Sequence, residues 1–387
     1  MPPANAFLSS AEAVTGERSY PLAVAACTSC GLVQLNYVVP AEELYRRYIY
    51  VSSTSEAVKA HAAQLTAACV RRFGWGGSDL VVEMASNDGT VLKAFQGAGL
   101  QVLGVEPARN IAAIAQAEGV PTVAEFFNAA TAKEIASQRG RAAGILGRHV
   151  FAHVDDLHDL LDGVSTLLAD DGVLLIEVPY LGDLLQKLEF DTMYHEHLSY
   201  LSLQPVIRLC ADHGLRVVDV ERVWLHGGSV LLTIQREACA GGGAPRLDAM
   251  LLEEQRALLT HPATLNAFSR RVSEWKQRFE ECISTLQSCG AELIGYGAAA
   301  KANTLLNYCP AVASALRCIL DRSPHKHGHW TPGTHIPVVP VEEWERNGAT
   351  HMVILAWNFK EEIMTQMRAF AQRGGRFVIP IPTPAVV

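Results

Sequence analysis

Short apolar runs alternate with amphipathic stretches along most of this chain, and this alternation restricts the fold more than any other feature. Strands are expected over residues 79–84, 101–106, 142–147 and 172–178, with helical patterns between them. Repeated strand–helix units of this length predict a mostly parallel, doubly wound sheet. Two later strands, 216–220 and 229–235, leave no room for an intervening helix and predict an antiparallel hairpin at one edge.

A second strand–helix series follows a glycine-rich linker at residues 240–245 and a long helical stretch, 247–288, broken near Pro262. Its strands are expected at 292–295, 315–320, 352–356 and 376–379, and its helices at 299–308 and 360–372. The fold class is therefore α/β, with a Rossmann-like core, a second, smaller Rossmann-like domain and a short irregular N-terminal domain. The expected boundaries are 1–60, 61–236 and 237–387.

Composition excludes several classes of protein. The 387 residues are 49% hydrophobic and 19% charged, and the apolar runs are too short and too often interrupted to span a membrane. A net charge of −8 without a long basic stripe argues against nucleic-acid binding. Nine cysteines, mostly scattered in apolar segments, and no evident signal peptide predict a reduced, cytoplasmic protein. We expect a monomer.

One short motif, Asp-Thr-Met-Tyr-His-Glu-His at 191–197, concentrates two imidazoles, a phenol and two carboxylates after an apolar strand. Groups this polar are costly to bury unless they are paired. General acid–base chemistry is one reason to place them there, since histidine titrates near neutral pH. An exposed polar loop would have a similar composition.

The turn after the first strand predicts a nucleotide site. Small residues at the carboxyl end of that strand let a ligand lie against backbone amides, and an acidic residue ending the second strand can accept hydrogen bonds from ribose hydroxyls. A single glycine and nearby acidic residues suit a cationic sulfonium better than a pyrophosphate, which favours S-adenosylmethionine over NAD. The alternative is a simple turn. The candidate cofactor-binding residues are Glu83, Ala85, Ser86, Asn87, Asp88, Gly89, Glu106 and Pro107.

Several motifs carry a resemblance that covers nearly the whole chain in order. They occupy residues 83–90, 104–108, 150–154, 177–180, 189–197, 226–229, 295–301, 303–308, 332–337 and 357–359. On these motifs the chain resembles the sugar-nucleotide C-methyltransferase family, class I methyltransferases that methylate C3 of dTDP-4-keto-deoxysugars in antibiotic pathways. The resemblance implies an S-adenosylmethionine-dependent enzyme with a dTDP-linked sugar substrate.

The resemblance also implies roles for individual residues. His197 would be the base that removes the C3 proton, with Tyr194 and Glu196 in the same motif. Glu196 is expected to orient His197 or to bind a sugar hydroxyl. His153 would face the substrate from the end of a core strand, and Tyr48 would reach the site from the N-terminal domain.

The C-terminal domain is expected to hold the nucleotide part of the substrate. Gly297 and its small neighbours would let a phosphate approach a helix N-terminus, although NAD binding or a purely structural role remains an alternative for these loops. The candidate substrate-binding residues are Tyr296, Gly297, Lys301, Asn303, Asn307, Asp321, Lys326, His335, Trp357 and Asn358.

The chain departs from the family pattern in several places. The family carries two Cys-X-X-Cys pairs that hold zinc, whereas this sequence has only Cys27 and Cys30, half of a four-thiolate site. Either the first pair precedes this sequence, or the metal is lost. Ala85 stands where glycine is usual, Ala302 replaces another glycine, and Gly-Arg-His at 147–149 replaces a small residue followed by asparagines.

The expected function is methyl transfer to a carbon of a nucleotide-linked 4-keto-deoxysugar through an enolate. The alternatives are methylation of a different acceptor, a non-catalytic protein that binds a sugar nucleotide, and a nicotinamide-dependent oxidoreductase.

Overall fold

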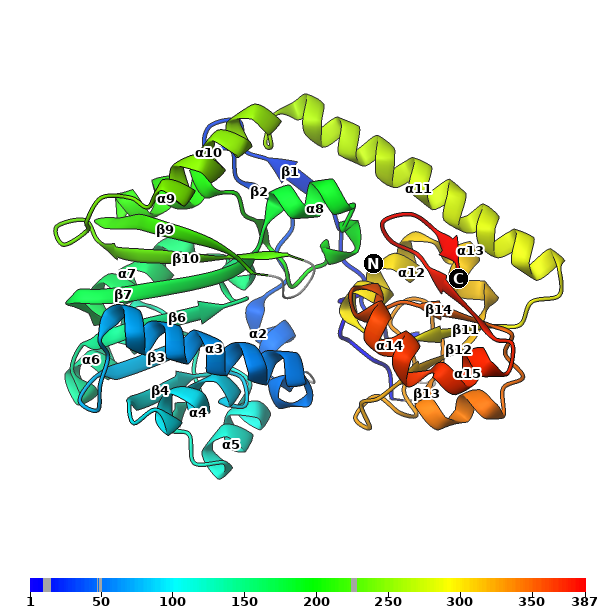
Figure 1. Ribbon diagram of the computed structural model, residues 1–387, viewed down its shortest axis with the longest axis horizontal. Coiled ribbons are helices and arrows are strands. Elements are labelled where there is room, and N and C mark those ends of the chain that lie inside the picture. Colours follow the sequence, from blue (N-terminus) through cyan, green and yellow to red (C-terminus); the bar gives the residue numbers. More distant parts are fainter. Residues whose placement is uncertain (10–14, 47, 49–50, 224–227) are drawn as a thin grey trace.

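The computed structural model describes residues 1–9, 15–46, 48, 51–223 and 228–387. This part of the chain forms two lobes, and the long helix α11 (Pro262–Ser288) runs from one to the other (Figure 1). The described residues form sheets of seven, six and three strands. The two larger sheets are the cores of the lobes.

The larger lobe contains the seven-stranded sheet, in the order β5-β4-β3-β6-β7-β10-β9. Its strands are β3 (Leu80–Met84), β4 (Gln101–Val105), β5 (Thr122–Val123), β6 (Ala142–Arg148), β7 (Leu168–Pro179), β9 (Leu215–Val223) and β10 (Ser229–Arg236). The first five strands in that order pair in parallel, whereas β10 pairs antiparallel with both β7 and β9. The predicted parallel sheet with an antiparallel hairpin at one edge is confirmed.

Helices join these strands and cover the sheet. They are α3 (Glu56–Phe73), α4 (Thr90–Gly97), α5 (Arg109–Ala117), α6 (Ala129–Arg139), α7 (Leu157–Leu167), α8 (Leu181–Lys187) and α9 (Leu203–Asp212). The apolar stripe of α7, including Leu160, Leu161 and Val164, is almost completely buried. Every residue of β3 is also buried, as expected for a central strand covered on both faces.

The smaller lobe repeats this plan with six strands in the order β13-β12-β11-β14-β15-β16. Its elements are β11 (Leu293–Tyr296), α12 (Ala300–Tyr308), α13 (Pro310–Ala315), β12 (Leu316–Asp321), β13 (Val338–Pro340), β14 (His351–Ile354), α14 (Lys360–Gln366), α15 (Arg368–Gln372), β15 (Arg376–Ile379) and β16 (Ala385–Val386). The first five strands are parallel and β16 is antiparallel. The single helix expected at 360–372 is divided at Met367, a correction to the sequence prediction.

The helices that connect the two lobes begin at prolines in the sequence. Helix α10 (Pro245–Ala257) and α11 both begin at a proline, where no backbone N–H is required. The His261 side chain accepts a hydrogen bond from the Ala263 amide and caps α11. The break predicted near Pro262 is therefore confirmed.

The N-terminal residues are more ordered and less separate than the sequence indicated. Strands β1 (Val24–Ala26) and β2 (Val33–Leu35) form a three-stranded sheet with β8 (Ser199–Tyr200), which comes from the larger lobe. The short helix α2 (Ala41–Tyr45) lies between the two lobes (Figure 1). Residue 8 pairs with Trp330 of the smaller lobe. The first segment of the chain thus contacts both lobes.

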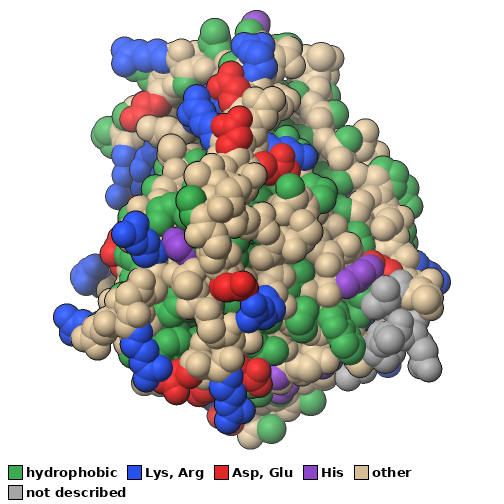
Figure 2. Space-filling view, turned by 90° about the vertical axis from the view of Figure 1, so that its right-hand side faces the viewer, with side chains coloured by type: hydrophobic (Ala, Val, Ile, Leu, Met, Phe, Trp, Pro, Cys, Tyr) green, Lys and Arg blue, Asp and Glu red, His purple; other side chains and the backbone are tan. Residues whose placement is uncertain are grey.

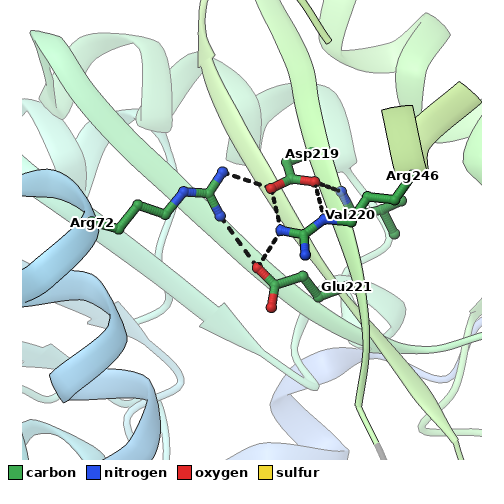
Figure 3. Close-up of polar contacts among 5 residues, drawn as sticks. All are labelled: Arg72, Asp219, Val220, Glu221 and Arg246. Atoms are coloured by element: carbon green, nitrogen blue, oxygen red, sulfur yellow. Dashed lines mark hydrogen bonds and ion pairs between the residues drawn. The ribbon is translucent and has the colours of Figure 1, made fainter. Parts of the chain in front are cut away.

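A charged network lies on the edge strand β9. Arg72 of α3 and Arg246 of α10 converge on Asp219 and Glu221 of this strand (Figure 3). The Glu221 side chain is 42% exposed and Asp219 only 4%, so solvent screens the ion pairs of Glu221 more than those of Asp219. Charged side chains on an edge strand also discourage pairing with another chain.

The outer face of the smaller lobe carries cationic and acidic side chains interspersed with apolar ones (Figure 2). Among the described residues, no helix is both long and apolar enough to cross a membrane.

Candidate functional site

A cavity of about 1300 Å³ opens between the two lobes. Its lining comes from the N-terminal segment, from the carboxyl ends of β3, β4 and β6, and from the loops after β11, β12 and β14. Ligands bind parallel α/β sheets at this end because the loops there are open and the backbone amides of the following helices point toward them. Tyr48, His153, Tyr194 and His197, all predicted catalytic residues, contribute to this lining.

The polar motif at 191–197 reaches the cavity by an indirect route. Helix α8 separates it from the apolar strand β7, so it does not follow that strand directly as the sequence indicated. The first two residues of the motif lie in the short 3-10 helix η3 (Phe190–Thr192). His195 points away from the cavity, is fully buried and donates a hydrogen bond to the Pro21 carbonyl. His226 and Gly227 of the predicted motif lie outside the described residues.

The hydrogen bonds of His197 fix its tautomer. Its Nδ1 lies 2.7 Å from the Thr192 carbonyl oxygen, which can only accept, so Nδ1 carries the proton in the neutral ring. Nε2 is then the acceptor, and it lies 3.0 Å from the Tyr194 hydroxyl. Burial, with a smaller contribution from His153, lowers the pKa of His197 well below its usual value. The ring is therefore neutral at pH 7 and able to accept a proton.

A second neutral imidazole stands beside the first. The His153 ring lies edge-on to that of His197, with their centroids 4.8 Å apart. The Tyr45 hydroxyl donates to the Glu196 carbonyl and lies 3.0 Å from Nδ1 of His153, which is therefore the protonated nitrogen. Burial lowers the pKa of His153 to about 3, so this ring is also neutral.

The Glu196 side chain does not orient His197, contrary to one of the sequence expectations. Its two carboxylate oxygens accept hydrogen bonds from the Tyr48 hydroxyl at 2.8 Å and the Asn5 amide at 2.7 Å. The side chain is 2% exposed and is not part of the cavity lining, whereas Tyr48 and Asn5 are. Burial raises the pKa of Glu196 to about 7. Glu196 therefore lies behind Tyr48 and fixes its hydroxyl.

The predicted cofactor loop follows β3 and has an unusual backbone. Ala85, Asn87 and Gly89 all have positive φ, at 50°, 52° and 74°. The Glu106 carboxylate fixes this shape by accepting hydrogen bonds from the Asn87 and Ala108 amides, each at 2.8 Å. Asparagine and glycine tolerate this conformation, whereas alanine is strained in it. This explains why glycine is the usual residue where this chain has Ala85.

The floor of the cofactor loop carries an unpaired carboxylate. Glu83 is 3% exposed, and its Oε2, like the Ser86 hydroxyl, is buried without a hydrogen-bond partner. Burial raises the pKa of Glu83 to about 8, although the nearby Arg148 acts in the opposite direction. A cationic ligand would relieve this cost by pairing with the carboxylate. The residues present therefore fit S-adenosylmethionine, which carries a sulfonium and an ammonium group.

The unusual segment at 147–149 forms a buried ionic cluster beside this loop. Glu177, which is fully buried, lies 2.7 Å from Nε2 of His61, 3.0 Å from Nε2 of His149 and 3.4 Å from Nε of Arg148. Although burial alone would raise it, hydrogen bonds from His149 and His61 hold the pKa of Glu177 well below its usual value. His149 adopts a positive φ of 52°, a conformation that asparagine tolerates better.

The smaller lobe supplies the opposite wall. Gly297 has a φ of 91°, and a Cβ there would lie 2.7 Å from the Ala356 side chain, so the tight turn before α12 requires glycine. Lys326 donates to the Ala298 carbonyl at 2.7 Å and lies 3.5 Å from Asp321. The N-terminal turn of α12 and the Lys326 ammonium group provide a site suited to an anion. The predicted residues in this wall are Tyr296, Gly297, Lys301, Asp321, Lys326 and Asn358.

Four of the predicted substrate-binding residues lie outside the cavity lining, which corrects their placement. Asn303 donates to the Ala4 carbonyl, and Asn307 donates to the carbonyls of Asn303 and Pro332. His335 pairs with Glu17 at 2.9 Å, and the Trp357 indole N–H donates to Asp191 at 2.6 Å. These side chains shape the lobe without reaching the cavity.

Two of the predicted cofactor residues also lie outside the lining. Asp88 accepts hydrogen bonds from the Ser53 amide and from Thr90, so it supports the loop from behind. Gly89 packs against Val120, which leaves no room for a side chain. By contrast Glu83, Ala85, Ser86, Asn87, Glu106 and Pro107 all line the cavity.

The described residues do not fit a structural zinc site. Cys27 and Cys30 lie in the turn between β1 and β2, and within the described ranges no group of three or more His, Cys, Asp or Glu side chains is arranged to hold a metal. Two thiolates supply half of a tetrahedral structural site.

Some residues of the site were not predicted from the sequence. Asn5 and Tyr45 line the cavity and contact Glu196 of the motif at 191–197. Tyr45 belongs to a tyrosine-rich stretch, which was a usable signal. No sequence signal indicated Asn5, because it is separated from Glu196 by 191 positions.

Comparison with known proteins identifies three family models and a relative that match this chain. Residues 61–220 match the family model of a methyltransferase domain, residues 224–382 that of a C-methyltransferase C-terminal domain, and residues 1–45 that of a zinc-binding domain. The C-methyltransferase NovU of Streptomyces niveus is 38% identical over 372 residues, which cover 96% of this chain and 89% of that protein.

Two solved methyltransferase structures are each similar to 46% of this chain. A methyltransferase from Anabaena variabilis that depends on S-adenosylmethionine is 15% identical, with a TM-score of 0.38 over 46% of this chain and 85% of that chain. The magnesium protoporphyrin IX methyltransferase of Synechocystis, solved with bound SAH, is 12% identical, with a TM-score of 0.36 over 46% of this chain and 82% of that chain.

Proposed function

Because this chain belongs to the family of C-methyltransferases that use S-adenosylmethionine, we propose that its acceptor is a carbon atom, C3, of a nucleotide-linked 4-keto-deoxysugar. The observation that carries the proposal is the unprotonated Nε2 of His197 on the cavity wall. A carbon nucleophile can be made at neutral pH only if a base removes the C–H proton that the adjacent ketone acidifies.

Proton removal is assigned to His197 and Tyr194. The Tyr194 hydroxyl donates a hydrogen bond to Nε2 of His197. In the reaction, the Tyr194 oxygen takes the proton from C3 and passes its own hydroxyl proton to Nε2. Burial raises the pKa of Tyr194 well above its usual value, so it is a protonated phenol before the reaction. Negative charge developing on the sugar raises the proton affinity of the neighbouring imidazole, which offsets its low pKa in the empty site.

The methyl group comes from S-adenosylmethionine, which supplies an electrophilic carbon when bound. Glu83, Ser86, Asn87 and Glu106 would hold it, since they line the cavity at the carboxyl ends of β3 and β4. Their buried carboxylates favour a cation there and disfavour a pyrophosphate. The same charge argues against NAD as the ligand of this loop.

The opposite wall is assigned to the nucleotide. Lys301 and Lys326 provide positive charge near the N-terminal turn of α12, where a diphosphate is favoured. With the cavity walls assigned in this way, the ketone of the sugar would face His197 and the nucleotide would face the smaller lobe.

The test is product identification. The full-length protein is incubated with S-adenosylmethionine and a dTDP-4-keto-deoxysugar, and the product is analysed by mass spectrometry and NMR. The proposal predicts one added methyl group bonded to the carbon beside the ketone. A methyl group on oxygen, or methylation of no sugar in a panel that differs in nucleobase and configuration, would contradict it.

A different methyl acceptor is the second candidate, and the cluster of Arg148, His149 and Glu177 favours it. Arg148 and His149 line the cavity beside the cofactor loop, where the family pattern has asparagines. They add hydrogen-bonding groups near the methyl-transfer position. Transfer to an acceptor without a ketone, with ketosugars inactive, would support this candidate.

A further inference from the structure

The N-terminal segment, residues 1–9, is anchored on the smaller lobe. The Asn303 amide of α12 donates to the Ala4 carbonyl at 2.7 Å, and Ala4 is fully buried. Leu8 exchanges two backbone hydrogen bonds with Trp330, at 3.0 and 2.9 Å. The Lys326 ammonium group lies 5.4 Å from the centre of the Phe7 ring. These contacts fix the backbone on both sides of Asn5.

The Asn5 side chain extends from this anchored segment to the catalytic motif of the larger lobe. Its amide donates to Oε1 of Glu196 at 2.7 Å, while the Tyr48 hydroxyl donates to Oε2 at 2.8 Å. Each carboxylate oxygen thus has one donor, and the two donors come from different parts of the N-terminal region. Because Glu196 is 2% exposed, water cannot readily replace either of them.

We propose that Asn5 is a positioning residue for the reaction: its amide fixes the Glu196 carboxylate against Tyr48, and Asn303 of the smaller lobe holds the segment that presents it. A short segment held by the lobe assigned to the nucleotide thereby contacts the motif at 191–197, in addition to the direct hydrogen bond from Trp357 to Asp191. The consequence for catalysis rests on the proposed function, whereas the effect on Glu196 does not.

The amide also influences the charge of Glu196. Burial raises the pKa of this carboxyl to about 7, and the hydrogen bonds from Tyr48 and Asn5 act in the opposite direction. The other groups that face it are phenols, Tyr45 and Tyr194, whose own pKa values burial raises well above 10. Loss of the Asn5 donor therefore shifts Glu196 toward its protonated form, which accepts less strongly from Tyr48.

The experiment measures the ionisation of Glu196 in the full-length protein. Infrared difference spectra between wild type and Glu196→Gln identify its protonated carbonyl band, which is then titrated with pH. Asn5→Leu keeps the size of the side chain and removes the donor, and Asn303→Leu removes the anchor. Asn307→Leu is the control, because its amide donates to the carbonyls of Asn303 and Pro332. Thermal melts verify that each variant folds.

We expect Asn5→Leu to raise the titration midpoint by about one to two pH units, the worth of one charge-assisted hydrogen bond. Asn303→Leu should raise it by a smaller amount, and Asn307→Leu should leave it unchanged. A folded Asn5→Leu protein with the wild-type midpoint overturns the proposal, and an unchanged Asn303→Leu overturns the link to the smaller lobe. A shifted midpoint in a protein without activity on ketosugars would instead reject the proposed function alone.

Discussion

The two walls of the cavity differ in how their polar groups are satisfied. On the larger lobe, His153 and His197 are neutral and Glu83 has a buried oxygen without a partner. On the smaller lobe, Asp321 accepts hydrogen bonds from the Ala298 and Ser323 amides, and Lys326 pairs with it. The wall of the larger lobe thus contains a buried carboxyl oxygen without a hydrogen-bond partner, whereas Asp321 and Lys326 of the smaller lobe are paired.

This difference indicates a division of labour. Groups with shifted pKa values and unpaired atoms are costly in the empty protein and are typical of reacting centres. Paired charges at loop ends form a stable frame for an anionic ligand. Substitutions on the first wall should therefore change turnover and cofactor affinity, and those on the second should change substrate affinity.

The largest effect is expected from His197→Asn. The asparagine amide can still donate to the Thr192 carbonyl in place of Nδ1, but it has no equivalent of Nε2. We expect kcat to fall by about 10³-fold, the usual worth of a general base. The affinity for S-adenosylmethionine, measured by calorimetry, should stay within about twofold.

His153→Asn is the matched control for this variant, because both rings are anchored through Nδ1. It should reduce kcat less than His197→Asn does. If His153→Asn were the more damaging change, His153 and not His197 would be the base.

Lys326→Met tests the opposite wall. If Lys326 binds a phosphate of the substrate as proposed, removing this cation should raise KM about tenfold or more while kcat changes by less than about threefold. Steady-state kinetics with the nucleotide-linked sugar would measure both. A large fall in kcat with an unchanged KM would contradict the assignment of substrate binding to the smaller lobe.

Glu83→Gln sharpens the account of the cofactor loop. Since the pKa of Glu83 is about 8 in the empty site, the carboxyl must lose its proton to pair with a cation, so cofactor affinity should weaken as pH falls below 8. The glutamine variant should bind about tenfold less tightly at pH 8 and lose most of this pH dependence. Calorimetric titrations between about pH 6 and pH 9 would show it.

The same substitution should have the opposite effect on stability. A carboxyl whose pKa is raised on folding makes the folded state progressively less stable as pH rises from the unfolded value toward 8. Without ligand, Glu83→Gln should therefore melt about 3 °C or more above wild type at pH 8.5 and equal it near pH 4.5. A lower melting temperature at pH 8.5 would contradict the burial cost assigned to Glu83.

The smallest effect is expected from Ala85→Gly. Glycine adopts a φ of 50° without strain but makes the unfolded chain more flexible, so these two effects partly cancel. The free energy of unfolding should change by less than about 1 kcal/mol, and cofactor affinity by less than about threefold. A large gain in affinity would show that the alanine distorts the loop.

The sequence predicted those parts of the molecule that depend on local patterns. The buried strand β3, the turn after it and the break at Pro262 follow from hydrophobic runs, small residues and proline. The motif at 191–197 was recognised from its composition and from family resemblance. What it could not show was the direction of each side chain, since His195 points to Pro21 and His197 to the cavity.

Long-range contacts account for most of the remainder. The orientation of Glu196 depends on Asn5 and Tyr48, which lie far away in the sequence. Asn303 has a polar side chain of a kind that often binds ligands, yet its amide donates a hydrogen bond to the Ala4 carbonyl of the N-terminal segment. No local pattern encodes such partners, because they are brought together only by the packing of the lobes.

The most direct test of the central claim is proton exchange at the carbon beside the ketone. A dTDP-4-keto-deoxysugar is incubated in heavy water with the protein and without S-adenosylmethionine, and the C3 proton signal is followed by NMR. We predict that the wild-type protein catalyses this exchange and that His197→Asn abolishes it. Equal exchange with both proteins, at a rate above the uncatalysed one, would contradict His197 as the base.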